Sequence, residues 1–392
     1  MDGTATQVPI RIFQVHNSYV HTGGEDTVVR TERAVLLAAD HEVRTMEVQN
    51  PTGVAALPAL AASMWNVASA RRIAEALYTW SPDVAHIHNT WFRLSPSILR
   101  ALRKRGVPIV ATVHNYRMAC LNGQFFRDGS ICEECIGRTP LPGVRFGCYR
   151  HSVPQSGIIA ASVTLGRAAS FWQNTVDRFV AMTPFQKDLL VRVGLRPEKI
   201  HVKPHFTADV GKRSAPASES DVILFVGRLG REKGIRNLML AWKKARPRNL
   251  RLVVIGDGPL RAEIEASRPS GVEMIGWASR ESVHEHLLSA RALVFPSVWY
   301  ETFGMVLIEA MAASLPIVAS DIGGIPWVLS DDRELAPPGD TDAWAGRLRE
   351  LDEDSFPVDD TGTGNRDRFE QHFSTKQGLQ NLERLYRDVL TH

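Results

Sequence analysis

Short apolar runs alternate with longer amphipathic segments through the first half of the chain. Five runs have the length and composition of buried parallel strands. They are Ile10–Val15, Glu42–Val48, Val84–His88, Pro108–Val113 and Arg178–Met182. Between them, four segments carry apolar residues at helical spacing, and these are Glu25–Ala39, Val54–Tyr78, Pro96–Arg105 and Gln155–Asn174. The alternation predicts a parallel sheet covered by helices on both faces.

A second series of the same kind follows. Its strand-like runs are Val222–Val226, Leu250–Ile255, Val272–Ile275, Ala292–Phe295 and Ile317–Ala319. Its helical segments are Ile235–Arg246, Leu260–Ser267, Glu281–Ser289 and Phe303–Ala313. The chain is therefore predicted to be α/β, with two doubly wound, Rossmann-like domains and a cleft between them. Ligands in such sheets bind beyond the carboxyl ends of the strands.

The polar segment Thr207–Ser220 separates the two series and predicts a linker. We place the domains at residues 1–205 and 206–375. The last periodic segment, Thr375–Leu390, is long enough to cross back, so residues 376–392 are assigned to the first domain. Glu353–Gly364 is rich in Asp, Thr and Gly, which predicts a mobile loop.

Composition narrows the class of protein. With 392 residues, 44% hydrophobic and 23% charged, the chain is typical of a soluble protein of about two domains. The net charge of +3 favours no particular partner. No basic stretch followed by an apolar one opens the chain, and the uncharged segment Val54–Ala70 is too short to span a bilayer. These features and the four cysteines predict a cytoplasmic protein.

The segment from Glu301 to Glu309 follows a predicted buried strand and enters a helix. Its first helical turn is predicted at Phe303, Gly304, Met305 and Val306, whose N–H groups suit a phosphate. Glu301 lies before this helix and Glu309 about two turns inside it. Two carboxylates so placed suit hydroxyl groups on either side of a diphosphate. The alternative is a surface glutamate and a helix-capping glutamate.

Gly227–Gly234 follows the first strand of the second domain and carries Arg228 and Lys233. A guanidinium and an ammonium projecting into the cleft suit a diphosphate that leaves with added negative charge. The alternative is a solvated basic turn.

Three glycines are weaker candidates for ligand contacts. Gly23 and Gly24 enter a helix after the first strand, and Gly258 ends a strand of the second domain. Any turn between a strand and a helix can use glycine, and no G-x-G-x-x-G run follows a strand here.

His114 ends a strand of the first domain and could hydrogen-bond a sugar hydroxyl, whereas His86 and His88 are predicted to be structural. Basic residues cluster at the end of the helix before it. They are Arg100, Arg103, Lys104 and Arg105. A solvated helix end is favoured for them, and a contact with an anionic membrane surface is the alternative.

All four cysteines lie within 29 residues, at Cys120, Cys132, Cys135 and Cys148. A structural four-thiolate zinc fits this count in a reducing compartment. Disulfides, free thiols and an iron–sulfur cluster remain open. The argument for zinc is that so short a segment, rich in Gly, Pro and Arg, cannot order itself by burying apolar surface.

Taken together, these motifs resemble glycosyltransferase family 4, a group of retaining enzymes with the GT-B architecture, and the resemblance covers nearly the whole chain. Its most specific parts are the Gly227–Gly234 loop and the Glu301–Glu309 segment, which continues to Gly323-Gly324-Ile325-Pro326. The first domain resembles a bacterial branch associated with surface polysaccharides and natural products. His205 stands where that branch often has asparagine.

The resemblance implies transfer of a sugar from a nucleotide diphosphate sugar to an acceptor hydroxyl. Residues matching Arg228 and Lys233 hold the diphosphate in this family, the one matching Glu309 binds ribose, and those matching Glu301 and His114 contact the donor sugar. No catalytic metal is expected, because the cations and the helix terminus supply positive charge, and the predicted strand ends carry no Asp-x-Asp run.

The expected partners are the nucleotide-sugar donor and an acceptor that is a saccharide, a lipid-linked sugar or a small-molecule aglycone. No nucleic acid is expected. Two alternatives stay open: a sugar-nucleotide epimerase of the same fold, and a non-catalytic nucleotide-sugar-binding protein.

Overall fold

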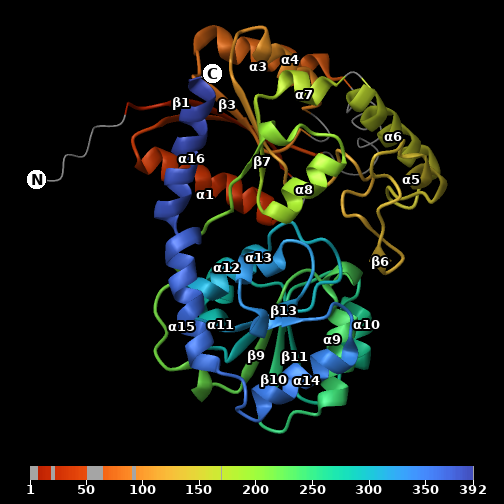
Figure 1. Cartoon of the computed structure of the whole chain (residues 1–392), viewed down its shortest axis with the longest axis vertical. Helices are drawn as coiled ribbons and strands as arrows, with labels where there is room; N and C mark the ends of the chain where they lie inside the picture. Colours follow the sequence, from red (N-terminus) through yellow and green to blue (C-terminus); the bar gives the residue numbers. More distant parts are fainter. Residues whose placement is uncertain (1–7, 19–22, 51–64, 91–93, 169, 392) are drawn as a thin grey trace, which may run out of the picture. The chain divides into compact units, whose positions relative to one another are not determined.

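The computed structural model describes residues 8–18, 23–50, 65–90, 94–168 and 170–391. Its contacts divide the chain into two compact units. The first unit is Met1–Gln124, Glu133–Lys203 and Gly378–His392, and the second is Phe125–Cys132 and Pro204–Gln377. Each unit contains a six-stranded parallel sheet with helices packed on it (Figure 1). The predicted fold class, two doubly wound α/β domains, is confirmed.

The first sheet has the strand order β2-β1-β3-β4-β7-β8, with every neighbouring pair parallel. Its strands are β1 (Arg11–Ser18), β2 (Glu42–Gln49), β3 (Val84–Ile87), β4 (Ile109–Thr112), β7 (Arg178–Ala181) and β8 (Ile200–Val202). The sequence predicts the first five within a few residues. It does not predict β8, whose three residues are too few for a periodic signal.

The helices of the first unit include α1 (Gly24–Ala38), α3 (Val67–Thr79), α4 (Ser97–Arg103), α5 (Leu141–Arg145), α6 (Val153–Ala168), α7 (Phe171–Thr175) and α8 (Pro184–Arg192). The single helix predicted at Gln155–Asn174 is wrong, because Ser170 adopts a left-handed backbone (φ 47°) and starts α7 as a separate element. The early part of the predicted helix Val54–Tyr78 lies outside the described residues.

The C-terminal helix α16 (Thr375–Leu390) matches its predicted bounds. From Gly378 onward it belongs to the first unit. Leu382, Leu385, Tyr386 and Val389 form its buried stripe, at the spacing of an amphipathic helix.

The second sheet has the strand order β11-β10-β9-β12-β13-β14, again all parallel. Its strands are β9 (Val222–Val226), β10 (Arg251–Ile255), β11 (Val272–Gly276), β12 (Ala292–Phe295), β13 (Ile317–Ser320) and β14 (Leu335–Ala336). Only the two-residue β14 is not predicted. Because β9 lies between β10 and β12, the direction in which strands are added reverses there, and such reversals are where doubly wound sheets bind ligands.

Successive side chains of β9 are buried on alternate faces of this sheet and contribute to the hydrophobic core on each face. Ile223 and Phe225 belong to the cluster that contains Trp242 and Trp344, whereas Leu224 between them is buried on the opposite face. Trp242 comes from α9 (Ile235–Ala245) and Trp344 from α14 (Thr341–Asp352), so these two helices cover one face together.

The other helices of the second unit are α10 (Arg261–Ser267), α11 (Arg280–Ser289), α12 (Met305–Ala312), α13 (Ile325–Leu329) and α15 (Val358–Arg368). The mobile loop predicted at Glu353–Gly364 is wrong, since α15 occupies most of it. Gly362 lets this helix pack closely, because a Cβ there would lie 2.3 Å from the carbonyl oxygen of Ser314. Asn365 donates from Nδ2 to Leu315 O (3.1 Å) and Glu334 Oε1 (2.7 Å).

The cysteine segment also packs better than its composition suggests. Leu121 is 1% exposed and packs with Ile159 and Val163 of α6, and the partly buried Val144 and Cys148 lie against the same cluster. The segment also forms a hairpin of β5 (Phe126–Arg127) and β6 (Ser130–Ile131). The premise that it cannot order itself through apolar burial is therefore wrong.

Candidate functional site

The candidate donor site of the second unit is built on two neighbouring strand ends. β9 leads into the loop Gly227–Gly234, which contains Arg228 and Lys233, and β12 leads into the loop Pro296–Gly304, which contains Glu301. The two loops are separated in sequence but emerge from the same edge of the sheet, where its strand order reverses.

Lys233 and Glu301 form the centre of this site. Lys233 Nζ lies 2.5 Å from Glu301 Oε2, and the same oxygen accepts from Ser297 Oγ (3.3 Å) and Trp299 Nε1 (3.0 Å). The ammonium also lies 5.3 Å from the ring centroids of Phe295 and Trp299, a favourable cation–π distance. With only 7% of its side chain exposed, Glu301 is held in one orientation by three donors.

Glycine makes the close approach of these loops possible. Gly234 has φ 68°, and a Cβ there would lie 1.8 Å from the carbonyl oxygen of Pro296. Gly323 has φ 63°, and its Cβ would lie 3.0 Å from the backbone nitrogen of Glu301. A side chain at Gly234 would force the two strand-end loops apart, and with them the Lys233–Glu301 pair.

Arg228 differs from Lys233 in being available to a ligand. Its side chain is 60% exposed, and Glu232 Oε1, at 4.0 Å, is its ion-pair partner. Because an exposed pair at this distance contributes little, the guanidinium can reorient towards an anion.

The helix α12 begins two residues later than predicted. Its first residue is Met305, and Gly304 precedes it with φ 85°. Phe303 is 1% exposed, with its ring centroid 5.2 Å from that of His205 and 5.8 Å from that of Phe373. Phe303 therefore anchors the loop in the core, and only its backbone could meet a ligand.

Glu309 lies in the second turn of α12 and is 12% exposed. Arg280 Nη2 lies 3.2 Å from Glu309 Oε1 and also donates to Thr207 Oγ1 (2.7 Å), while His284 Nε2 is 3.9 Å from the same carboxylate oxygen. Sequence reasoning missed Arg280 and His284. Their i,i+4 spacing places both on one face of α11, but nothing in the sequence indicates that this face meets α12.

Gly258 has a packing role. A Cβ there would lie 2.7 Å from the carbonyl oxygen of Leu229, so the turn after β10 must pass close to the Gly227–Gly234 loop. The prediction that Gly258 touches a ligand remains untested.

The glycines of the first unit lie in an acidic environment. The N–H of Gly23 donates to Asp26 Oδ2 (2.8 Å), and Gly24 opens α1, whose first turn also contains Glu25. Burial raises the pKa of Asp26, but hydrogen bonds from His16 and Gly23 outweigh it, so the pKa lies below its usual value. Carboxylates here disfavour a phosphate at this helix start.

His114 lines a cavity of about 540 Å³ in the first unit. Its Nε2 lies 3.2 Å from His88 Nδ1, so one of the two imidazoles donates to the other. Burial, followed by the charges of His16 and Lys203, lowers the pKa of His114 to about 3. The imidazole is therefore neutral at physiological pH.

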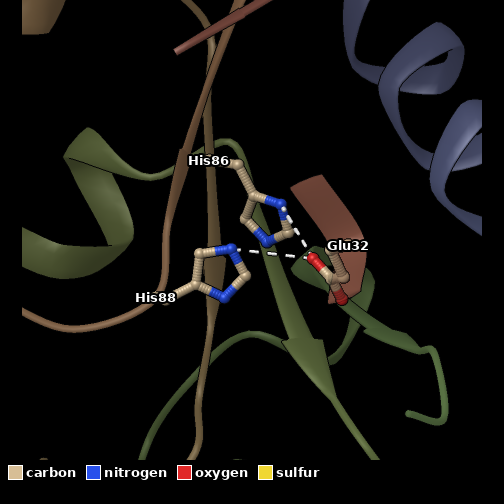
Figure 2. Close-up of side chains that lie close together, drawn as sticks. All are labelled: Glu32, His86 and His88. Carbon is tan, nitrogen blue, oxygen red and sulfur yellow. Dashed lines mark ion pairs between the residues drawn. The ribbon is translucent and has the colours of Figure 1, made fainter. Parts of the chain in front are cut away.

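A second cluster lies between α1 and the carboxyl end of β3. Figure 2 shows Glu32 facing the rings of His86 and His88, with Glu32 Oε2 at 3.7 Å from His86 Nδ1 and 3.6 Å from His88 Nε2. Within the described part of the chain, this is the group of His, Cys, Asp and Glu side chains close enough to share a metal ion.

The contacts of this cluster favour a structural role over metal binding. Lys203 Nζ lies 2.7 Å from Glu32 Oε1, so a cation already balances the buried carboxylate. His86 uses both ring nitrogens, with Tyr386 OH and Thr112 Oγ1 each at 2.8 Å. Burial holds the pKa of His86 well below its usual value, so its ring is neutral, as it is for His88.

The four cysteines form no disulfide. Cys120 Sγ donates to Asn122 Oδ1 (2.9 Å). Among the described residues of the first unit, Cys120, Cys135 and Cys148 do not converge as three ligands of one ion would. This arrangement gives the predicted zinc site no support, and the metal content of the protein stays a prediction.

The basic cluster at the end of α4 is partly neutralised. Arg103 Nη1 lies 3.0 Å from Asp177 Oδ1, which fits a solvated helix end. None of the helices in the described ranges is both long enough and apolar enough to cross a membrane.

Comparison with known families covers most of the chain. Residues 17–205 match the family model for a glycosyl transferase 4-like domain, and residues 220–354 match that for glycosyl transferases group 1.

Among characterised relatives, the alpha-maltose-1-phosphate synthase of Mycolicibacterium smegmatis is 30% identical over 54% of this chain and 63% of its own length. The 2-deoxystreptamine glucosyltransferase of Streptomyces kanamyceticus is 25% identical over 86% of this chain and 83% of its own. The sulfoquinovosyl transferase SQD2 of Arabidopsis thaliana is 24% identical over 78% and 57%. The chain thus matches less than two thirds of the length of the first and last of these relatives.

Solved structures agree in fold over nearly the full length. Sucrose-phosphate synthase from Thermosynechococcus elongatus superposes with a TM-score of 0.72 at 18% identity, covering 97% of this chain and 99% of that one. Anabaena Alr3699/HepE, in complex with UDP and glucose, gives a TM-score of 0.66 at 15% identity, covering 96% and 99%.

Proposed function

The chain belongs to glycosyltransferase family 4 and has the GT-B fold, and from this premise we propose that it transfers a sugar from a nucleotide diphosphate sugar to an acceptor hydroxyl with retention at the anomeric carbon. One observation carries the proposal. Lys233 and Glu301 pair at 2.5 Å at the point where the strand order of the second sheet reverses. The UDP complex of the similar Anabaena protein supports a nucleotide-sugar donor.

Lys233 and Arg228 would hold the diphosphate. Their positive charges, with the first N–H groups of α12, would oppose the negative charge that grows on the leaving group. The protein itself thus supplies the positive charge that a divalent metal would otherwise provide, so we expect chemistry independent of metal.

Glu301 would bind the donor sugar. Its three donors all reach Oε2, and among the described residues Oε1 receives no hydrogen bond, which leaves it able to accept from a sugar hydroxyl. Glu309 would bind the ribose in the same way, because Arg280 holds Oε1 and orients the carboxylate. His114 remains assigned to a donor-sugar hydroxyl, as a neutral imidazole.

The acceptor would be a saccharide, a lipid-linked sugar or a small-molecule aglycone, in the making of a polysaccharide, a glycoconjugate or a natural product. The likeness to a 2-deoxystreptamine glucosyltransferase favours the last of these settings. We propose a cytoplasmic protein, with contact to the inner face of the membrane where the acceptor is lipid-linked.

Incubation with UDP-, GDP- and TDP-sugars in the absence of acceptor tests the activity. A transferase should slowly release nucleoside diphosphate and a free sugar, and proton NMR at early times should show the anomeric configuration of the donor. An epimerase would instead convert the sugar while it stays attached to the nucleotide, and a binding protein would bind without any turnover. The variant Lys233→Met should abolish the release.

A further inference from the structure

Thr207 hydrogen-bonds two segments that connect the units of the chain. The chain enters the second unit at Pro204 and leaves it after Gln377. We call residues 204–209 the entry segment and residues 373–377 the return segment. The N–H of Thr207 donates to Phe373 O (3.1 Å), its carbonyl oxygen accepts from Thr375 Oγ1 (3.3 Å), and the two segments form a parallel β-bridge there. The entry and return segments are therefore paired within the second unit.

The side chain of Thr207 connects this pairing to Glu309. Thr207 is 0% exposed, and its Oγ1 accepts from Arg280 Nη2 (2.7 Å), the same nitrogen that lies 3.2 Å from Glu309 Oε1. Among the described residues, Thr207 and Glu309 are the two hydrogen-bond partners of the Arg280 side chain, and its Nε is buried without one. The hydroxyl of Thr207 therefore fixes the direction from which the guanidinium meets the carboxylate.

Aromatic packing joins the same two segments to the start of α12. Phe303, just before this helix, packs with its ring centroid 5.2 Å from that of His205 in the entry segment and 5.8 Å from that of Phe373 in the return segment. Phe373 is also the last residue of a single π-helical turn, Phe369–Phe373, and such turns are frequent at functional sites. A shift of the paired segments would thus reach the helix that carries Glu309 by two routes, the Phe303 ring and Arg280.

A second arginine ties the entry segment to α12 without contacting Glu309. Arg366 Nη1 donates to Asp209 Oδ1 (2.8 Å) in the entry segment and to Ala312 O (2.6 Å) at the end of the helix. This link reaches α12 through a backbone carbonyl oxygen rather than through the carboxylate. It therefore offers a matched comparison, because it attaches the same segment to the same helix without orienting Glu309.

We propose that Thr207 and Arg280 position Glu309 for the ribose, so that nucleotide binding and the pairing of the entry and return segments stabilise each other. The proposal rests on the function proposed above, because it needs the ribose at Glu309. Such coupling is reciprocal: the pairing favours the nucleotide by the same free energy by which the nucleotide favours the pairing. Thr207 and Arg280 are positioning residues, since Glu309 is the group that would touch the ligand.

Calorimetric titration of the full-length protein with UDP and 2′,3′-dideoxy-UDP, whose sugar has neither hydroxyl, tests the proposal. The guanosine analogues serve if UDP does not bind. The wild type should bind UDP at least about tenfold more tightly, because the dideoxy sugar cannot hydrogen-bond the carboxylate. Thr207→Val keeps the branched shape but removes the acceptor of Arg280, so the ratio of the two affinities should fall to about threefold or less. Thr207→Ala should behave in the same way, whereas Thr207→Ser keeps the hydroxyl and should keep the ratio.

A double-mutant cycle separates positioning from a general loss of stability. In the Glu309→Ala background, Thr207→Val should change the affinity for UDP no further, since both substitutions act through one carboxylate. Asp209→Asn, which weakens the link through Arg366, is the control. It should keep the wild-type ratio of affinities even where it lowers the melting temperature.

Hydrogen–deuterium exchange tests the reverse direction. At equal saturation, UDP should slow exchange of the Thr207 amide, which donates to Phe373 O, more than 2′,3′-dideoxy-UDP does, and Thr207→Val should abolish the difference. A wild-type ratio in both Thr207→Val and Thr207→Ala, or equal protection by the two nucleotides in the wild type, would overturn the coupling. Equal affinity of the wild type for the two nucleotides would remove the ribose from Glu309 and the coupling with it, whereas binding of UDP itself would still support the donor site.

Discussion

Among the described residues, each unit contains one lysine–glutamate pair at close range, and the two pairs have opposite surroundings. In the first unit, Lys203 and Glu32 lie 2.7 Å apart with side chains 3% and 1% exposed. In the second, Lys233 and Glu301 lie 2.5 Å apart with side chains 19% and 7% exposed. The first pair is fully buried among neutral histidines, and we call it the sealed pair. The second pair lies where the strand order reverses, next to an exposed arginine and the start of a helix.

The difference indicates that accessibility and neighbours, rather than the ion pair itself, separate structural from functional charge. A sealed pair can only stabilise the fold, or destabilise it when one partner is lost. A pair at the rim of the sheet can exchange partners with a ligand. The comparison predicts that equivalent substitutions in the two pairs affect different measurements.

The largest effect should come from Lys203→Met. Removal of the ammonium leaves the Glu32 carboxylate buried and uncompensated, so the free energy of unfolding should fall by about 3–5 kcal/mol. Urea denaturation followed by circular dichroism measures this. Lys104→Met, an exposed lysine at the end of α4, should stay within about 0.5 kcal/mol of the wild type. A loss below about 1 kcal/mol for Lys203→Met would mean that the pair is not a sealed structural element.

Lys233→Met and Arg228→Ala should each lower turnover by about two orders of magnitude or more, because both cations oppose charge on the leaving diphosphate. Initial rates of nucleoside diphosphate release measure this. Arg228→Ala should leave the melting temperature unchanged, because its side chain is 60% exposed. Lys233→Met should lower it less than Lys203→Met does, because Ser297 and Trp299 still donate to Glu301. Lys243→Met, exposed on α9, is the control. Rates within a few-fold of wild type in either site variant would remove that residue from the diphosphate site.

Glu309→Ala should weaken nucleoside diphosphate binding by about 1.5–3 kcal/mol, the contribution of a hydrogen bond to a charged group. Calorimetric titration gives the value directly. Glu285→Ala, an exposed glutamate on α11, should bind as the wild type does. Unchanged affinity in Glu309→Ala would mean that the carboxylate serves only its ion pair with Arg280.

The smallest effect concerns pH. The pKa of His114 is about 3 in the native protein, against an ordinary value of 6.5. Below pH 6.5 the unfolded state therefore binds the additional proton, and the stability due to neutral His114 is lost as pH falls. Between pH 6.5 and pH 5 this loss is about 1.6 kcal/mol for a single group. His114→Asn should lose stability less steeply than the wild type by that amount, and parallel curves would contradict a neutral imidazole at His114.

The second unit's strand ends were predictable because their chemistry is local in sequence. Arg228 and Lys233 occupy one loop, and Glu301 and Glu309 one loop-to-helix segment, each directly after a continuous apolar strand. The fold class followed from the same alternation of strands and helices. The sequence did not predict that Arg280 of α11 meets Glu309 of α12. The spacing of apolar residues shows which face of a helix is buried, but it does not show which other helix that face packs against.

The contacts of Glu32 with His86, His88 and Lys203 in the first unit were not predictable for the same reason. Glu32 lies within a helix and Lys203 at the end of a strand 171 positions later, so nothing local pairs them. The helix α15 was missed for a related reason. Glycine, threonine and aspartate have low helix propensity, but Gly362 allows close packing and Asn365 hydrogen-bonds across to Glu334, and these tertiary contacts outweigh local preference.

The most direct test of the donor site is a calorimetric comparison of UDP with UMP in the wild type, Lys233→Met and the sealed-pair variant Lys203→Met, at a temperature where all three are folded. GDP with GMP, and TDP with TMP, serve if UDP does not bind. We expect the wild type and Lys203→Met to bind the diphosphate at least about tenfold more tightly than the monophosphate, and Lys233→Met to lose this preference. A preference that survives in Lys233→Met, or no binding of any nucleoside diphosphate to the wild type, would contradict a donor site at Lys233 and Glu301.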